Sequence, residues 1–388
     1  MDDITWIVLS RIKGLGIKKL ILILNKYPDL KLDDISTVEF TQEIAKLIYD
    51  DYTLAKLNDR NYILNQIDSV KEQINFHNKF GIKLIPYNNI NYPEQLKLIK
   101  DPPLILYCMG NLEVLKNTKN VAVVGTRKPT DMGIKVAEKV TTSFAERDFT
   151  IVSGLALGID TIGHKAALKA NKTTIAVMAG SLDKIYPREN KFLADQIINQ
   201  NGLLISENPI GAATMRSAFV KRDRIQSGLS IGICPVQTSI DGGTMHTIRY
   251  AYEQKRLLFT PKILEPKDMY EYSGIIEAIN KYGAHILETT NDYETLISLM
   301  EQNYNNIKRS NNKESKVAIP VIKSLDDVEQ ISLFESPSST SATKVILKDK
   351  KLVDIVNQCS QLAKEYNVSK SAILKNIDQV WEQLKYEN

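Results

Sequence analysis

Little in the 388-residue chain could build a metal site or a disulfide framework. Its three cysteines lie far apart in the sequence, and it has only four histidines. This usage excludes a zinc pattern and predicts a reducing, cytoplasmic location. Apolar runs of membrane-spanning length are also missing: a span needs roughly 20 residues, whereas the stretch at 17–24 is short and contains lysines. The start of the chain has no basic segment ahead of an apolar one, so no signal peptide is expected.

The formal charge of +4 identifies no partner by itself. Its distribution is uneven: residues 119–262 contain 20 Lys and Arg against 12 Asp and Glu, while the rest of the chain contains 30 and 34. A basic block in a nearly neutral chain indicates an anionic partner at that block, although an uneven surface charge without any partner explains the same count.

Residues 1–78 are predicted to form a helical domain, because apolar residues recur in them at helical spacing. Near its start, Gly14-Leu15-Gly16 separates two short helical stretches. This pattern is typical of SAM-like or helix–hairpin–helix DNA modules, whose backbone amides approach phosphates, and equally of an ordinary packing corner. The following segment, up to residue 118, is marked by prolines and is predicted to be extended.

Strand-like and helix-like segments alternate strictly within residues 119–262. The strands are short, continuous apolar runs such as VAVVG at 121–125, which are typical of strands buried on both faces. We therefore predict an α/β fold centred on a Rossmann-like, doubly wound parallel sheet, within a domain at 79–300. A polar linker is expected at 301–342, and a small helical, winged-helix-like domain at 343–388.

Glycines and small hydroxyl residues gather where the predicted strands end. Parallel strands bring such loops together at one edge of a sheet, and several of these loops lead into helix N-termini, which favour phosphate. The loops lack both the G-x-G-x-x-G dinucleotide fingerprint and a Walker A motif, so no cofactor is expected. The residues predicted to form phosphate-binding loops are Gly125, Thr126, Ser153, Gly154, Gly158, Gly180, Gly242, Gly243 and Thr244.

A second concentration of binding chemistry is the segment Phe219–Arg224, which contains three cations and one aromatic ring. Cations neutralise phosphates and an aromatic ring stacks on bases, so this composition suits a nucleic-acid strand. The plainer interpretation is an exposed helix start whose phenylalanine is anchored in the core. The residues predicted to contact DNA are Arg127, Lys128, Phe219, Lys221, Arg222 and Arg224.

Taken in order, the motifs of the central block resemble those of the DNA-processing protein family DprA, also called Smf. The resemblance covers about residues 92–261 and is carried by VAVVGTRKPT, IVSGLALGIDTIGHKAAL, TIAVMAGSLDKIYPREN and FVKRDRIQSGLS. It implies a protein without enzymatic activity that binds single-stranded DNA, forms a homodimer and helps to load a RecA-type recombinase in natural transformation. Phe219 would contact a base or a sugar. The residues that would hold phosphates are Arg127, Lys221, Arg222 and Arg224.

Three positions depart from the pattern of the family that this chain resembles. Asp223 stands where the family usually has asparagine, Gln237 where it has glutamate, and the loop at 242–244 reads Gly-Gly-Thr instead of a Ser-Gly-Ser type. An acid inside a phosphate track is unfavourable. The rival hypothesis is a nucleotide-binding sensor or a phosphoribohydrolase of the same superfamily, with a role such as defence against foreign DNA. Asp160 and His164 share a helix face and suit either an acid/base pair or, as we expect, local packing.

Overall fold

The computed structural model describes residues 1–35, 37–48, 50–213, 215–266 and 269–314 of the chain. The C-terminal domain predicted for 343–388 lies outside these residues, as does the predicted linker beyond Glu314. Within the described ranges, no helix is both long enough and apolar enough to cross a membrane.

The first part of the predicted linker is helical, because α13 (Asp292–Glu314) continues through residues 301–314. Leu296, Met300 and Tyr304, spaced four residues apart, are buried in the cluster beneath the sheet. Residues at this spacing share one face of a helix. The polar composition around this narrow apolar stripe is what concealed the helix.

Residues 1–78, predicted to form a helical domain, contain helices around a buried apolar cluster, in which Trp6 is fully buried. The side chains of Asp2, Asp50 and Asp59 each accept a hydrogen bond from a backbone amide in the first turn of a helix, and so fix where it begins. These helices are α1 (Asp3–Arg11), α2 (Ile17–Lys26), η1 (Leu32–Asp34), α3 (Val38–Ile48), α4 (Asp51–Asn58) and α5 (Arg60–Lys79).

The turn between α1 and α2 packs against α4. Gly14 has a φ of +97°, and a Cβ at this position would meet the side chain of Thr53. The Thr53 hydroxyl Oγ1 donates a hydrogen bond to the carbonyl oxygen of Lys13 at 3.0 Å. The glycine is therefore required by a close approach within the domain, as expected of a packing corner.

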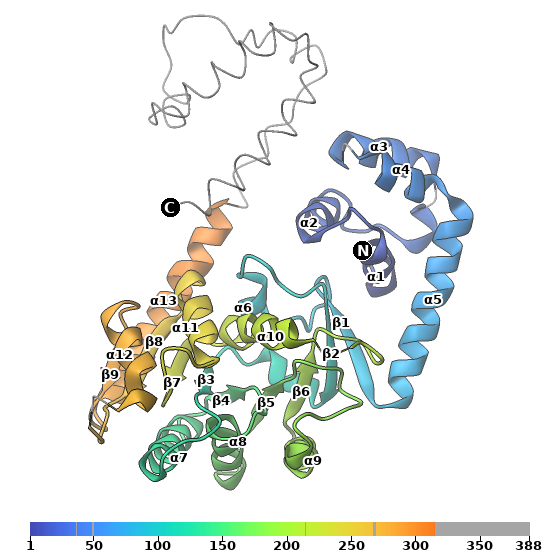
Figure 1. Cartoon of the computed structure of the whole chain (residues 1–388). Helices are drawn as coiled ribbons and strands as arrows, with labels where there is room; N and C mark the ends of the chain where they lie inside the picture. The colour runs from blue at the N-terminus through green and yellow to red at the C-terminus, as the bar shows by residue number, and fades with distance from the viewer. Residues whose placement is uncertain (36, 49, 214, 267–268, 315–388) are drawn as a thin grey trace, which may run out of the picture. The chain divides into compact units, whose positions relative to one another are not determined.

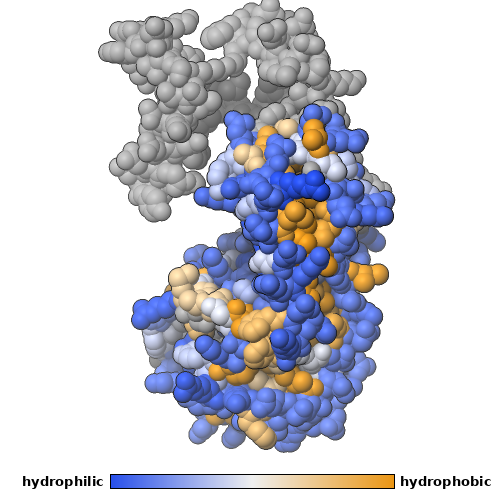
Figure 2. Space-filling view, turned by 90° about the vertical axis from the view of Figure 1, so that its right-hand side faces the viewer, coloured by the Kyte–Doolittle hydropathy of each residue, from blue (hydrophilic) through white to orange (hydrophobic). Residues whose placement is uncertain are grey.

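The long helix α5 leads from the helical domain to the sheet (Figure 1). Near its end, Nε2 of the buried His77 accepts a hydrogen bond from the backbone N–H of Ile210 at 3.0 Å, which ties the helix to a loop of the next domain. Phe76 on the same helix and Phe80 just after its end remain about half exposed, at 46% and 48%. Figure 2 shows the side on which α5 lies as a hydrophilic surface broken by apolar patches.

The sheet of the described residues has nine strands in the order β1-β2-β6-β5-β4-β3-β7-β8-β9. The predicted parallel arrangement is confirmed for seven neighbouring strands of this order, β6, β5, β4, β3, β7, β8 and β9. At the other edge, β1 pairs antiparallel with β2, and β2 pairs antiparallel with β6; this segment was predicted only as extended. The short β9 was not predicted. The strands are β1 (Ile82–Pro86), β2 (Ile105–Gly110), β3 (Asn120–Val124), β4 (Thr150–Ser153), β5 (Thr174–Val177), β6 (Leu203–Ser206), β7 (Gly232–Pro235), β8 (Leu257–Pro261) and β9 (His285–Leu287).

Helices cover both faces of the sheet, with α6, α10 and α11 on one face and α7, α8 and α9 on the other (Figure 1). Alternate residues of a central strand serve the two layers: Ala122 and Val124 belong to one apolar cluster, and Val121 and Val123 to the other. The covering elements are α6 (Glu94–Lys97), η2 (Leu112–Lys116), α7 (Asp131–Ala145), α8 (Ile159–Lys169), η3 (Arg188–Asn190), α9 (Lys191–Asn199), α10 (Arg216–Leu229), α11 (Thr244–Glu253), η4 (Tyr270–Tyr272) and α12 (Ser273–Asn280).

The strand order changes direction at β3, which has β4 on one side and β7 on the other. Loops that leave neighbouring strands at such a switch point diverge, and ligands bind in the crevice beyond the carboxyl ends of the strands. The loops after β3 and β7 begin together there, since the Thr126 N–H donates to the Gln237 carbonyl oxygen at 2.7 Å. The fold therefore places the predicted glycine-rich loops beside one crevice.

Candidate functional site

The crevice at the carboxyl ends of β3, β4 and β7 is a cavity of about 550 Å³, which we call the strand-end cavity. Its walls are the loops after these strands, the start of α8, the part of α10 from Phe219 to Gln226, and the first turn of α11. Nine of the residues predicted from the sequence line it together: Gly125, Thr126, Arg127, Lys128, Phe219, Arg222, Gly242, Gly243 and Thr244.

The remaining predicted glycines differ in their roles. Gly154 and Gly180 line a small adjoining cavity of about 60 Å³, which shares Arg127, Phe219 and Arg222 with the strand-end cavity. Gly158 lines neither cavity: it has a φ of +79°, and a Cβ there would lie 2.3 Å from the carbonyl oxygen of Thr126. It therefore supports the loop after β3 from behind.

Ser153 also supports the site from behind, since it is buried and lines neither of the two cavities. Its hydroxyl donates to the carbonyl oxygen of Val123 at 2.7 Å and so joins β4 to β3. Its role in a phosphate loop stays a prediction. In the structure, its side chain forms a hydrogen bond between two strands.

Arg127 and Lys128 are exposed at the mouth of the strand-end cavity. Among the described residues, no carboxylate forms an ion pair with either of them. The Arg127 guanidinium carbon lies 6.0 Å from the centroid of the Phe219 ring, which in turn meets the Tyr186 ring edge-to-face at 5.8 Å. Arg127, Lys128 and the Phe219 ring thus line the strand-end cavity, and the Tyr186 ring lines the small adjoining cavity.

Arg222 lies at the base of the strand-end cavity and is buried, with 7% of its surface exposed. Its Nη1 donates to the carbonyl oxygens of Gly154 and Val177, each at 2.6 Å, and its Nε donates to Asp223 Oδ1 at 3.0 Å. These bonds hold the ends of β4 and β5 against α10. Phosphate binding by Arg222 stays a prediction, but most of its hydrogen-bonding capacity is used within the fold.

Two carboxyl groups also face the base of the strand-end cavity. Asp160 accepts hydrogen bonds from the amides of Gly154 and Ala156 at 3.0 and 3.4 Å. Burial raises the pKa of Asp160 above its usual value, and burial raises the pKa of Asp223 to about 6 against the opposing effect of the Arg222 charge. The site is therefore cationic at its mouth and carries buried acids at its base.

Asp160 and His164 do not form a pair. The His164 Nδ1 lies 2.7 Å from the Thr174 hydroxyl on β5, and burial together with the charge of Arg222 lowers the pKa of His164 to about 3. The Nε2 of His164 forms no hydrogen bond with any described residue. The expected local packing of this imidazole agrees with these contacts.

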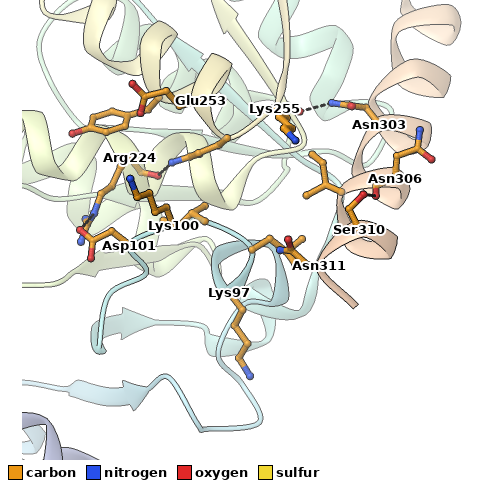
Figure 3. Close-up of a pocket in the computed structure, with 15 residues that line it drawn as sticks. Lys97, Lys100, Asp101, Arg224, Glu253, Lys255, Asn303, Asn306, Ser310 and Asn311 are labelled. Atoms are coloured by element: carbon orange, nitrogen blue, oxygen red, sulfur yellow. Dashed lines mark hydrogen bonds and ion pairs between the residues drawn. The ribbon is translucent and has the colours of Figure 1, made fainter. Parts of the chain in front are cut away.

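Arg224 is on the other side of α10 from the strand-end cavity. It lines a second cavity of about 600 Å³, which we call the rear cavity, where Figure 3 shows it beside Asp101 at one end and asparagines of α13 at the other. Its Nη2 lies 2.7 Å from Glu207 Oε2 and its Nε lies 3.2 Å from Asp101 Oδ2. Lys221 is exposed and lines neither cavity. The structure therefore does not bring the three cations of Phe219–Arg224 into one track.

Sequence reasoning missed two contributors to the site. Tyr186 was quoted only as part of a motif, and its exposure at 56% with its ring against Phe219 needed the structure to be seen. Gln237 was noted only as a departure, but its Oε1 accepts the Thr130 N–H at 3.0 Å and fixes the start of α7. Within the described part of the chain, no cluster of three or more His, Cys, Asp or Glu side chains is placed to hold a metal ion.

Comparison with known proteins gives a consistent set of similarities. A sequence profile described as DNA recombination-mediator protein A matches residues 83–298. The DNA processing protein DprA of Bacillus subtilis is 41% identical over 179 residues, which are 46% of this chain and 60% of that protein. Protein Smf of Escherichia coli is 39% identical over 188 residues, 48% of each chain. The chain thus spans about half the length of these curated relatives.

A solved structure supports the same similarity in three dimensions. The X-ray structure of DNA processing protein A from Streptococcus pneumoniae superposes with a TM-score of 0.59 at 28% sequence identity. The match covers 76% of this chain and 96% of that one. It extends beyond the central block that carried the sequence motifs.

Proposed function

The chain belongs to the DNA recombination-mediator protein A family, the DprA family, and we propose that it binds single-stranded DNA in the strand-end cavity. We further propose that a homodimer delivers the bound strand to a RecA-type recombinase, and the family description as a recombination mediator supports the delivery step. The strand is held and passed on in this scheme, and no bond in it is made or broken.

The observation that carries the proposal is a pair of exposed cations, Arg127 and Lys128, which lie beside the Phe219 ring and form no ion pair with a carboxylate in the described part of the chain. Phosphates along a strand need cations that are not already committed to carboxylates, and successive bases stack on aromatic rings. The first turn of α11, entered through Gly242 and Gly243, adds backbone amides that favour an anion.

The proposal that there is no covalent chemistry is supported by the contacts of the groups best suited to acid/base work. Asp160 is occupied by two loop amides, and His164 is enclosed against Thr174 with a pKa lowered by burial. A general base must lie within hydrogen-bond reach of a bound substrate. Asp160 reaches the strand-end cavity but is bonded to the two loop amides, and His164 lines none of the cavities described above.

Fluorescence anisotropy with a labelled oligothymidylate at two salt concentrations tests the binding proposal. We expect affinity to fall steeply as salt rises, because counterions released from the phosphates contribute to binding. Lys128→Ala, at the mouth of the strand-end cavity, should weaken binding to all sequences alike. Its matched control is Lys169→Ala, an exposed lysine at the far end of α8. Absent or salt-independent binding would refute the proposal.

A small nucleotide is a second candidate ligand, favoured by the size of the strand-end cavity. Its volume of about 550 Å³ lies in the range typical of small-molecule sites, roughly 300–1,000 Å³. A thermal-shift screen of mono-, di- and cyclic nucleotides separates the two candidates. Strong stabilisation by one nucleotide, without DNA binding, would favour a nucleotide sensor.

A further inference from the structure

Asp223 is an acid in the base of a cavity that we propose to hold phosphates. Its side chain is 12% exposed, and it lines the strand-end cavity. One carboxyl oxygen, Oδ1, accepts the Nε–H of Arg222 at 3.0 Å. The other, Oδ2, accepts no hydrogen bond from any described residue. The carboxyl group thus has one oxygen bound within the fold and one free for a ligand.

Charged groups face Asp223 from each element packed around it. Arg222 lies next to it on α10, Asp160 approaches from α8, and Arg127 comes from the loop after β3. On α11, His246 lines the same cavity and Tyr250 lies within electrostatic range of the carboxyl group. Burial first, and then the charge of Asp160, favour the protonated form, whereas the two arginines favour the ionised form.

A phosphate oxygen entering this cavity adds one more negative charge beside these carboxyl groups. An ionised Asp223 would repel it, while a protonated carboxyl group can donate a short O–H···O⁻ hydrogen bond to it. We propose that Asp223 takes up one proton from solution when a phosphodiester strand binds, and that its neutral carboxyl group then donates from Oδ2 to a phosphate oxygen. This inference rests on the proposed function, because it assigns the proton linkage of the same site.

The direction of the pH effect follows from this proton uptake. The free protein has an Asp223 pKa of about 6, and the bound phosphate raises the pKa further. Binding therefore takes up a proton at pH values between the free and the bound pKa. Affinity is highest below about pH 6, falls as pH rises through this window by up to about tenfold per pH unit, and levels off above it.

The experiment measures the dissociation constant of oligothymidylate from pH 5.5 to 8 at constant ionic strength, for the full chain and for Asp223→Asn. The asparagine keeps an oxygen for the Arg222 Nε–H and offers a neutral donor, so D223N should bind at pH 7.5 at least as tightly as the unchanged protein does at pH 6. Its affinity should vary less than twofold across the range. Calorimetry in two buffers of different ionisation enthalpy counts the protons directly and should give a fraction of a proton up to one, absent in D223N.

Two further variants separate Asp223 from other sources of pH dependence. His246→Gln removes the imidazole that lines the cavity, and Asp195→Asn removes an exposed acid on α9 outside it. Both should keep the slope. A slope that survives in D223N, or that disappears in H246Q, overturns the inference and leaves DNA binding in place. No binding at any pH refutes the proposed function itself, so the two failures are distinguishable.

Discussion

The helix α10 separates two cavities whose arginines differ in their partners. On the strand-end side, Arg127 and Lys128 stand at the mouth without carboxylate partners among the described residues. On the rear side, Arg224 is enclosed between Glu207 and Asp101. Both cavities contain cations and have similar volumes, about 550 and 600 Å³. The arginine on the rear side is thus held by two carboxylates, whereas Arg127 and Lys128 form no ion pair with a carboxylate of the described residues.

This difference shows that cations which are neighbours in the sequence can lie on different faces of the helix they belong to. Residues two positions apart lie on nearly opposite faces of an α-helix, because each residue turns by about 100°. Arg222 therefore points under the strand ends while Arg224 points to the rear. Spacing along the chain, as much as composition, decides which cations meet a ligand.

The largest effect is expected from Arg222→Ala, which should lower the free energy of unfolding by about 3–5 kcal/mol. It removes the donor to the carbonyl oxygens of Gly154 and Val177 and leaves Asp160 and Asp223 without their buried counter-charge. Urea denaturation followed by circular dichroism measures this loss. Arg216→Ala, at the exposed start of α10, is the control. A loss below about 1 kcal/mol would show that Arg222 belongs with the free cations.

Next in size is the effect of replacing both Arg127 and Lys128 by alanine on DNA binding. We expect an affinity loss of about a hundredfold, roughly 2.7 kcal/mol, with little change in stability, because both side chains are exposed. Loss of two phosphate contacts should also reduce the slope of log affinity against log salt by about 1.4. Anisotropy titrations over a salt series measure both quantities. An unchanged slope would place the phosphate contacts elsewhere.

Replacing the Phe219 ring should have a smaller effect. Phe219→Ala removes the ring that lies against Arg127 and Tyr186, and we expect binding to weaken by about 1–3 kcal/mol, the usual range for one stacked base. Phe219→Tyr keeps the ring and should bind nearly as well, in the same anisotropy titration. Equal losses in both variants would mean that the ring packs within the fold and does not contact DNA.

The parallel centre of the sheet was predictable because its strands are continuous apolar runs with small residues at their ends. VAVVG and its counterparts are buried on both faces, so their sequence shows no alternation. The antiparallel pair β1 and β2 escaped prediction, because pairing with β6 depends on contacts far along the chain. The prediction of a linker from residue 301 was wrong for a similar reason. The burial of three α13 side chains against the sheet holds that segment as a helix, although most of its residues are polar.

The sequence predicted which loops form the site, but it predicted less well which individual side chains point into it. Gly125, Arg127 and Gly242 meet because parallel strands end at one edge, which the order of motifs already required. The fate of Arg224 depends on Asp101 and Glu207, which lie 123 and 17 residues away in the chain. A local sequence pattern does not predict ion-pair partners at such separations along the chain.

The smallest effect on binding is expected from Arg224→Gln, and it tests the comparison of the two cavities most directly. Because Arg224 is neutralised by Glu207 and Asp101 in the rear cavity, its loss should change the affinity for oligothymidylate less than about twofold and leave the salt slope unaltered. The measurement is the same titration, made at a temperature where unfolding experiments show the variant to be folded. The double change at Arg127 and Lys128, which line the strand-end cavity, serves as the positive control. If Arg224→Gln instead weakens binding as much as the change at Arg127 and Lys128, the strand crosses α10 and the two cavities form one binding surface.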